Sequence, residues 1–322
     1  GAVDPAERAS DLPDVLQSRG VILRPRANVR SRPSLDPSSV KFTLAQGQRI
    51  EVLKVQDYWY NIRTPDGREG WVIAPMVSLG VGLIRPETYL GGAQALVEAG
   101  CRRVGTQLEV SSKAAVLEGS QLLEKWVEIY PDSSHTGRAY YYLGLARAAI
   151  AKLHNAQRDP DAKTYVDAHA SLYRSLPDKG FALYNGSDFD AVLRSFPQSS
   201  VAPAALLERA IVRRQHVCQS AGRCNFTTTL EVFRDVFDGR ATAKGKETGV
   251  EILVDDLRET TGNPVADRAA LKQSIDSFLN IVTGMTHLEL RKEALRKIAA
   301  AYQAMNFPED AKRTLRLIGP SS

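Results

Sequence analysis

The chain has 322 residues, of which 43% are apolar and 25% are charged, and this ordinary globular composition excludes a disordered or fibrous protein. Its 42 Lys and Arg residues against 37 Asp and Glu residues give a net charge of +5, which is too small for a protein that neutralises many phosphates, so we expect no nucleic-acid partner. The longest apolar stretch, from Trp71 to Ile84, has about 14 residues, whereas a membrane-spanning helix needs ~20, so we expect no transmembrane segment.

The first residues do not show the basic and then apolar pattern of a signal peptide. Residues 1–20 contain Asp4-Pro5 and Pro13 and are predicted to form a tether or a short helix. Because the chain starts with Gly1-Ala2, we expect that a targeting peptide has been removed, and membrane anchoring would require such a removed signal or lipid.

Residues 21–82 show the pattern of several short strands. Apolar, β-branched and aromatic residues form short runs such as 49–55 and 59–62, and the first of these alternates with polar residues. Residues 64–67 (Thr-Pro-Asp-Gly) are predicted to form a turn, since Pro presets φ at one corner and Gly accepts a positive φ at another. Short strands with turns this close together indicate a small all-β barrel.

Four segments of this region resemble the bacterial SH3-like domain. They read Ala-Asn-Val-Arg-Ser-Arg-Pro-Ser (27–34), Leu-Ala-Gln-Gly (44–47), Tyr-Trp-Tyr-Asn-Ile (58–62) and Pro-Asp-Gly-Arg-Glu-Gly-Trp-Val (65–72). Arg32 stands where the family usually has Gly, so we expect either strain at this residue or a rebuilt turn. The resemblance implies a bacterial recognition domain outside the cytoplasm, since members attached to cell-wall enzymes hold cross-linked peptides in a groove.

From residue 83 the apolar period changes from 2 to 3.6, which predicts an all-α region over 83–322. Two similar joints, Tyr-Pro-Asp-Ser-Ser and Phe-Pro-Gln-Ser-Ser, begin at residues 130 and 196, about two ~34-residue repeats apart. A further helical pair has its turn at 306–308. These features resemble tetratricopeptide-like repeats, and in particular the tetratricopeptide-like lipoproteins of bacterial outer-membrane assembly and their periplasmic relatives.

Two stretches of the helical region fit neither pattern. Residues near 157–187 and 238–246 are rich in turn-forming or small polar residues, so we expect insertions there, the second followed by a helix over 247–260. The predicted organisation is therefore a tether (1–20), an all-β SH3-like barrel (21–82) and an all-α tetratricopeptide-like domain (83–322).

Four arginines give the barrel its first set of candidate ligand-binding residues. Four guanidinium groups fall within nine residues, all at even-numbered positions: Arg24, Arg26, Arg30 and Arg32. In an extended segment they would share one face and form a site for carboxylates or an anionic polymer. The alternative is a solvated loop whose arginines pair with the acidic residues of the barrel, namely Glu51, Asp57, Asp66 or Glu69.

Four aromatic residues form the second set: Tyr58, Trp59, Tyr60 and Trp71. Strand alternation places Trp59 on the opposite face from Tyr58 and Tyr60. We therefore expect one face in the core, while the other could line a groove.

In the helical region, stacked helix pairs would leave a concave surface that commonly holds a peptide or a partner helix. Tyr140 and Tyr141 flank a predicted core position at Tyr142 and could face this partner-binding groove. The alternative is that both tyrosines pack against the next helical pair.

The sequence shows no motif for catalysis, cofactor binding or metal binding. It has no Gly-x-Ser-x-Gly elbow, no Gly-rich phosphate loop and no His-Glu-x-x-His, and its five histidines are isolated. Acidic residues such as Asp188 are expected to cap helix starts. Cys218 and Cys224 bracket a short loop that could close as a disulfide in an oxidising compartment, or both could remain thiols. We therefore expect no enzyme, no cofactor and no metal.

These features predict a non-catalytic scaffold or adaptor in the periplasm or cell envelope of a bacterium. Its barrel would bind peptidoglycan or a peptide, and its helices would bind a protein partner. Two alternatives stay open. One is an accessory or regulatory subunit of a cell-wall hydrolase, and the other is an enzyme with its site at the junction of barrel and helices.

Overall fold

The computed structural model describes residues 19–79, 86–261 and 267–319. Contacts divide the chain into two compact units, the first reaching to residue 102 and including 110–146, the second made of 103–109 and the residues from 147 onward. Helix α4 (Thr136–Gln157) therefore contributes its first half to the first unit and the remainder to the second.

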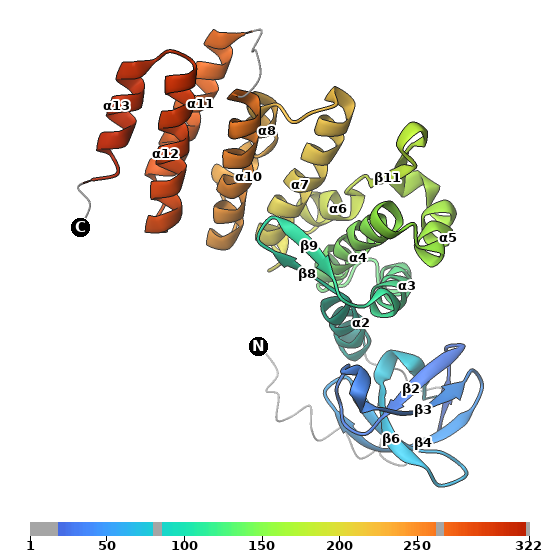
Figure 1. The fold of residues 1–322 in the computed structure, drawn as a ribbon. Helices are drawn as coiled ribbons and strands as arrows, with labels where there is room; N and C mark the ends of the chain where they lie inside the picture. Colours follow the sequence, from blue (N-terminus) through green and yellow to red (C-terminus); the bar gives the residue numbers. More distant parts are fainter. Residues whose placement is uncertain (1–18, 80–85, 262–266, 320–322) are drawn as a thin grey trace. The chain divides into compact units, whose positions relative to one another are not determined.

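The first unit begins with a seven-stranded antiparallel sheet (Figure 1). Its strands are β1 (Arg19–Ile22), β2 (Arg26–Arg30), β3 (Val40–Ala45), β4 (Arg49–Gln56), β5 (Trp59–Arg63), β6 (Glu69–Ile73) and β7 (Val77–Ser78). They pair in the order β3-β2-β6-β5-β4-β1-β7, and the sheet buries a core of small and β-branched side chains that includes Val29, Val52, Ile62 and Val72. The predicted β-rich domain is confirmed. The tether predicted over 1–20 lies outside the described residues, except that Arg19 and Gly20 belong to β1.

The hairpin between β5 and β6 turns where the sequence predicts. The Thr64 N–H donates to the Arg68 carbonyl oxygen at 2.9 Å, and Gly67 has a φ of +88°. Only glycine adopts this corner without strain, which explains why a Pro-Asp-Gly turn stands here.

Arg32, for which the sequence predicts either backbone strain or a rebuilt turn, lies in the loop between β2 and β3. Arg32 does not have a positive φ, so its backbone carries no strain. Instead the Ser34 N–H donates to the Arg32 carbonyl oxygen at 2.8 Å, and the Arg32 guanidinium lies 3.0 Å from the Asp36 carboxylate. The turn is therefore rebuilt around a side chain that the family usually lacks.

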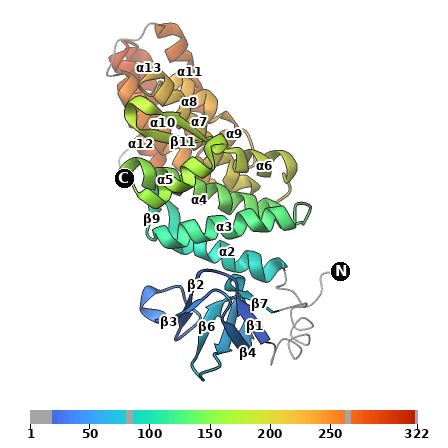
Figure 2. The same cartoon turned by 90° about the vertical axis from the view of Figure 1, so that its right-hand side faces the viewer.

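Helix α2 (Pro86–Gly100) packs against the sheet, and α3 (Lys113–Ile129) packs against α2 (Figure 2). α2 lies close to the sheet, and α3 lies close to α2, because glycines stand at both contacts. A Cβ at Gly92 would lie 2.6 Å from Pro75 Cδ, and a Cβ at Gly119 would lie 2.7 Å from Val97 Cγ2. The boundary predicted at residue 82 stays a prediction, while contacts place α2 and α3 in the same compact unit as the sheet.

The second unit is mainly helical, as predicted. Beyond α4 its helices are α5 (Pro160–Ala168), α6 (Ser187–Ser195), α7 (Ala202–Ala221), α8 (Phe226–Val232), α9 (Arg234–Phe237), α10 (Ala243–Thr261), α11 (Arg268–Thr283), α12 (Leu288–Ala304) and α13 (Pro308–Arg316). The predicted joint at 196–200 falls between α6 and α7, and the turn at 306–308 falls between α12 and α13. The tetratricopeptide-like arrangement itself stays a prediction.

Two β-hairpins correct the all-α prediction for 83–322. The first joins β8 (Cys101–Val104) and β9 (Gln107–Val110), and the second joins β10 (Tyr173–Leu176) and β11 (Phe181–Tyr184) within the predicted insertion at 157–187. Gly105 and Gly180 turn them with φ of 54° and 62°. The strand over 107–110 (Gln-Leu-Glu-Val) alternates between polar and apolar residues, a local signal that the prediction passed over, whereas 181–184 (Phe-Ala-Leu-Tyr) shows no such alternation. Helix α10 also begins earlier than the predicted 247–260, which leaves a shorter loop than expected at 238–246.

A buried ion pair joins α4 to α6 inside the second unit. Arg147 Nη1 donates to Asp188 Oδ1 at 2.8 Å and to Oδ2 at 2.9 Å, and the Tyr184 hydroxyl also donates to this carboxylate. Arg147 and Asp188 are only 8% and 3% exposed. Burial alone would lower the pKa of Arg147, but the Asp188 carboxylate and the Tyr165 hydroxyl raise it overall. Asp188 lies in the first turn of α6, as the sequence suggests, but its side chain does not cap the helix and instead acts as the buried counter-ion of Arg147.

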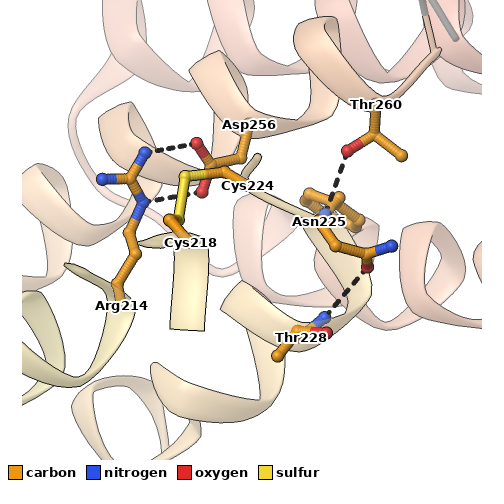
Figure 3. Close-up of a disulfide and its surroundings, with 8 residues drawn as sticks. Arg214, Cys218, Cys224, Asn225, Thr228, Asp256 and Thr260 are labelled. Carbon is orange, nitrogen blue, oxygen red and sulfur yellow. Dashed lines mark hydrogen bonds and ion pairs between the residues drawn. A yellow bond between two sulfur atoms is a disulfide. The ribbon is translucent and has the colours of Figure 1, made fainter. Parts of the chain in front are cut away.

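Cys218 of α7 and Cys224, which precedes α8, form a disulfide (Figure 3). Beside it, the Arg214 guanidinium donates to both carboxylate oxygens of Asp256 at 2.8 and 2.5 Å (Figure 3). The Asn225 side chain accepts from the Thr228 N–H and caps α8. The disulfide thus links the end of one helix to the start of the next.

Replacing both Cys218 and Cys224 with serine is expected to lower the free energy of unfolding by roughly 2 kcal/mol, because the bridge restricts a short loop in the unfolded chain. Urea denaturation followed by circular dichroism measures this change. Dithiothreitol should destabilise the wild-type protein by a similar amount and leave the double variant unchanged. If the reductant acted equally on both proteins, the assigned role of this disulfide would be wrong.

Candidate ligand-binding groove

The first unit contains a groove of about 540 Å³ between the sheet and the pair α2–α3. Arg26, Asn28 and Arg30 of β2 line one side of it. They share this side because Ala27 and Val29, which alternate with them, point into the core and are fully buried. The even-numbered face predicted for this segment is therefore formed along β2.

The rest of the groove is mostly apolar with a few hydroxyl groups. The loop after β2 contributes Leu35 and Pro37, and α2 contributes Leu96. The start of α3 contributes Ser112, whose side chain caps the helix by accepting from the Ala115 N–H at 3.2 Å. A ligand in the groove would thus meet cationic side chains on one wall and apolar side chains on the other.

Arg30 is held in place by neutral groups. Its Nη1 donates to the Asp36 carbonyl oxygen at 3.1 Å and to Ser39 Oγ at 3.0 Å. The residue is 8% exposed, and burial lowers its pKa, with the Asp36 charge opposing the shift. The guanidinium therefore has a fixed orientation without a carboxylate bonded to it.

The other three arginines differ from one another. Arg24 lies 2.6 Å from the Glu118 carboxylate of α3, and Arg32 pairs with Asp36. Arg26 is exposed and forms no ion pair among the residues that the structure describes. The predicted fork of four arginines is thus corrected. Two of them line the groove, and the other two are neutralised by acids other than the barrel acids proposed from the sequence.

The aromatic residues do not gather at this groove, and the predicted alternation of buried and exposed rings is wrong for β5. Trp59 and Tyr60 are both 4% exposed. Trp59 pairs across strands with Ile73, which faces α2 at Gly92, whereas Tyr60 pairs with the core residue Val72. Helix α2 therefore covers the face of the sheet that would otherwise meet solvent.

Tyr58 and Trp71 are partly exposed, and each lies against a different neighbour. The Tyr58 ring packs on Gly91 of α2, where a Cβ would lie 3.3 Å from it. Burial, followed by the nearby Glu98 and Asp57 charges, raises the pKa of Tyr58. Trp71 lies under Lys54, whose Nζ is 6.0 Å from the ring centre. Neither ring lines the groove.

Tyr140 and Tyr141 lie half-buried on α4. Tyr141 contacts the edge of Tyr142 at 5.2 Å between ring centres, and the Tyr142 hydroxyl accepts from Gln94 of α2. Tyr142 thus faces α2, as a core position would, and the role of Tyr140 and Tyr141 in partner binding stays a prediction.

One group of potential metal ligands occurs in the second unit. The ligand atoms of Cys224, Asp256 and Glu259 lie within 4.8 Å of one another. Cys224 is already bonded to Cys218 and Asp256 to Arg214, so the donors of this group have other partners.

Residues 25–78 match the bacterial SH3 domain family. The chain therefore contains a bacterial SH3 domain, which includes β2 through β7, followed by a helical region. The match includes Arg26 and Arg30, whereas the wall formed by α2 and α3 lies outside it. No curated protein matches the chain. None of the described helices is long and apolar enough to cross a membrane.

Sequence analysis missed the helical wall of the groove. Leu96, Ser112 and Glu118 lie far from the SH3 segment in the sequence, and no local pattern connects them to Arg24 or Arg30. The Ser112 cap is the one local signal, and it marks the start of a helix without indicating what that helix faces.

Proposed function

We propose that this protein is a non-catalytic scaffold or adaptor of the bacterial cell envelope. Its SH3 domain would bind peptidoglycan or a peptide, and its helical region would bind a protein partner. The observation that carries the proposal is the groove of the SH3 domain, in which one wall presents Arg26 and Arg30 and the other is apolar. Bacterial SH3 domains occur in envelope and secreted proteins, which supports a location outside the cytoplasm.

The helical region is the second half of this proposal. If its helices form tetratricopeptide-like hairpins, each pair buries its apolar stripe against the next and leaves a concave surface for a partner. The second unit contains a pocket of about 520 Å³ lined by residues of α4, β11 and α7. Two modest sites on one chain would raise the effective affinity for an assembly that presents both ligands.

A second candidate function is an accessory subunit of a cell-wall hydrolase, in which this chain supplies affinity for the wall and a partner supplies the chemistry. The groove favours this role over a catalytic one, because it pairs cations with apolar side chains, and the one carboxylate that lines it within the described part of the chain, Glu118, is already engaged by Arg24. Release of dye from labelled cell wall by the purified chain alone would contradict the non-catalytic proposal.

The full chain is expected to sediment with purified peptidoglycan, and Arg26→Glu is expected to weaken this retention by roughly tenfold or more. The substitution removes a hydrogen-bond donor from the groove and adds a negative charge, which would repel an anionic ligand. A cosedimentation assay over a range of peptidoglycan concentrations measures the change.

Arg49→Glu is the matched control, because Arg49 is an exposed arginine of β4 outside the groove and undergoes the same change of charge. It should leave retention nearly unchanged. An equal loss of retention in both variants would indicate non-specific attraction to peptidoglycan. No retention of the wild-type chain would contradict peptidoglycan as a ligand.

A further inference from the structure

We propose that the groove beside Arg30 binds a short extended peptide through a free carboxylate, which provides the counter-ion that this guanidinium lacks. The inference rests on the proposed function, because it names the chemistry of the ligand at the same groove. Three observations carry it: the unbalanced charge of Arg30, the placement of polar groups along β2, and the apolar wall opposite them.

The first observation is the charge. A buried charge is costly unless an opposite charge or strong hydrogen bonds compensate it. Arg30 is 8% exposed, and its acceptors, a carbonyl oxygen and a hydroxyl group, are both neutral. Among the described residues, Glu118 is the only acidic side chain lining the groove, and it lies 2.6 Å from Arg24. The groove therefore keeps an excess of positive charge that an incoming carboxylate would neutralise.

The Asp36 carboxylate does not fill this role. It accepts from the Ser38 N–H at 2.9 Å and pairs with Arg32 at 3.0 Å, and it is the Asp36 carbonyl oxygen that accepts from Arg30. The hydrogen bonds from Ser38 and the Arg32 charge lower the pKa of Asp36, so it stays ionised and engaged in its own loop.

The second observation is the placement of polar groups along β2, beginning with the nitrogen atoms of Arg30 that remain free to donate. Nη1 anchors Arg30 to the loop, whereas Nε and Nη2 have no hydrogen-bond partner among the described residues. Because its position is already fixed, Arg30 would lose little side-chain entropy when a carboxylate binds.

Asn28 and Arg26 follow on the same side of β2. Their Cα atoms lie about 7 and 13 Å from that of Arg30, given the rise of an extended chain. A peptide of about four residues laid along β2 would reach from Arg30 to Arg26. Its backbone amides would meet the Asn28 side chain, and Arg26 would face a second carboxylate or a carbonyl group.

The third observation is the apolar part of the lining, where Pro37 and Met76 of the SH3 segment and Leu96 of α2 offer apolar contacts to small side chains. The pocket of the second unit makes a useful contrast. Two of the three cations among its described lining residues already have counter-ions, since Arg103 is bonded to the Glu208 carboxylate at 2.8 and 2.6 Å and Arg214 is bonded to Asp256. The third, Lys152, donates to the Leu108 carbonyl oxygen at 2.6 Å. The groove of the SH3 domain is therefore the better carboxylate site.

Fluorescence anisotropy with the full chain tests the proposal. The probes are two labelled tetrapeptides, one a stem peptide released from peptidoglycan and the other L-Ala-Ala-Ala-Ala, each prepared with a free C-terminal carboxylate and as the C-terminal amide with its other carboxyl groups blocked. We expect the free acids to bind roughly tenfold to a hundredfold more tightly than the amides, as for a charge-assisted hydrogen bond. Tighter binding of the stem peptide would identify peptidoglycan as the source of the ligand. Tighter binding of the alanine peptide would identify the C-terminus of a protein.

Three variants locate the carboxylate. Arg30→Gln should abolish the difference between acid and amide. Arg26→Gln, at an exposed position, should weaken binding of the acid severalfold without affecting folding. Glu118→Gln should strengthen binding of the acid, because it removes a negative charge from the lining of the groove. Arg49→Gln is the control and should change nothing.

Equal affinities of acid and amide, or an unchanged preference in both Arg26→Gln and Arg30→Gln, would overturn the inference. Retention of the full chain on peptidoglycan without binding of either free acid would also overturn it and would leave the proposed function standing. If the wild-type chain neither sedimented with peptidoglycan nor bound either free acid, the proposed function would be contradicted as well.

Discussion

Replacing Asp188 with asparagine is expected to lower the free energy of unfolding by about 3–5 kcal/mol, the usual result of removing one partner from a buried ion pair. The Arg147 guanidinium would then be buried without the carboxylate that accepts from its Nη1 at 2.8 and 2.9 Å, and the Tyr184 hydroxyl would lose a charged acceptor. Chemical denaturation followed by circular dichroism measures the loss.

Two controls make this prediction specific. Lys163 and Asp167 form an exposed pair at 2.5 Å, and Asp167→Asn should cost less than about 1 kcal/mol because water screens the exposed charges. The double variant with Arg147→Met and Asp188→Leu should recover part of the loss, since it removes both buried charges. If Asp188→Asn were no more destabilising than Asp167→Asn, the buried pair would not be contributing to stability.

Replacing Trp126 with alanine is expected to lower the free energy of unfolding by about 3–5 kcal/mol. Trp126 is fully buried on α3, and its Nε1 donates to the Pro86 carbonyl oxygen at 2.9 Å. The alanine variant would leave a large cavity between α2 and α3 and would remove the hydrogen bond from the indole to the Pro86 carbonyl oxygen. Circular dichroism at increasing urea concentrations is the appropriate measurement, because the substitution also removes a fluorophore.

Trp126→Phe separates the contribution of the buried apolar volume from that of the Nε1 hydrogen bond, because it keeps most of the volume and removes the hydrogen bond. We expect it to cost roughly 1–3 kcal/mol. Ile129→Ala, three residues away on the same helix, is the control, since Ile129 is 50% exposed and should contribute little. A loss of similar size in Ile129→Ala and Trp126→Ala would contradict the packing of α2 against α3 described above.

The groove is formed by a short domain together with the helices that follow it in the chain. The SH3 segment supplies Arg26 and Arg30, but α2 and α3 close the groove and remove Arg24 from it through Glu118. The ligand preference of this domain would therefore depend on residues outside the family match. Comparing SH3 segments alone would miss the wall that faces Arg30.

Much of the local structure could be predicted from the sequence. The period of two and the Thr64–Gly67 turn locate the strands, and the period of 3.6 with its Pro-containing joints locates most helices. Local sequence also placed Arg26 and Arg30 on one side of β2. The two hairpins in the helical region escaped prediction because their four-residue strands lie among segments with a helical period, although residues 107–110 do alternate between polar and apolar.

The sequence by itself determined most of the strands and helices, except for the two short hairpins of the helical region, because these choices depend on backbone propensity and on apolar spacing within a few residues. Tertiary structure alone decided which charges are balanced. Glu118 reaches Arg24, and Asp188 reaches Arg147, across long separations in the chain, whereas Arg30 is buried among neutral acceptors. Burial and ion pairing depend on what the fold brings together, and it is the packing of α2 on the sheet that buries Trp59, whereas Tyr60 is buried in the core beside Val72.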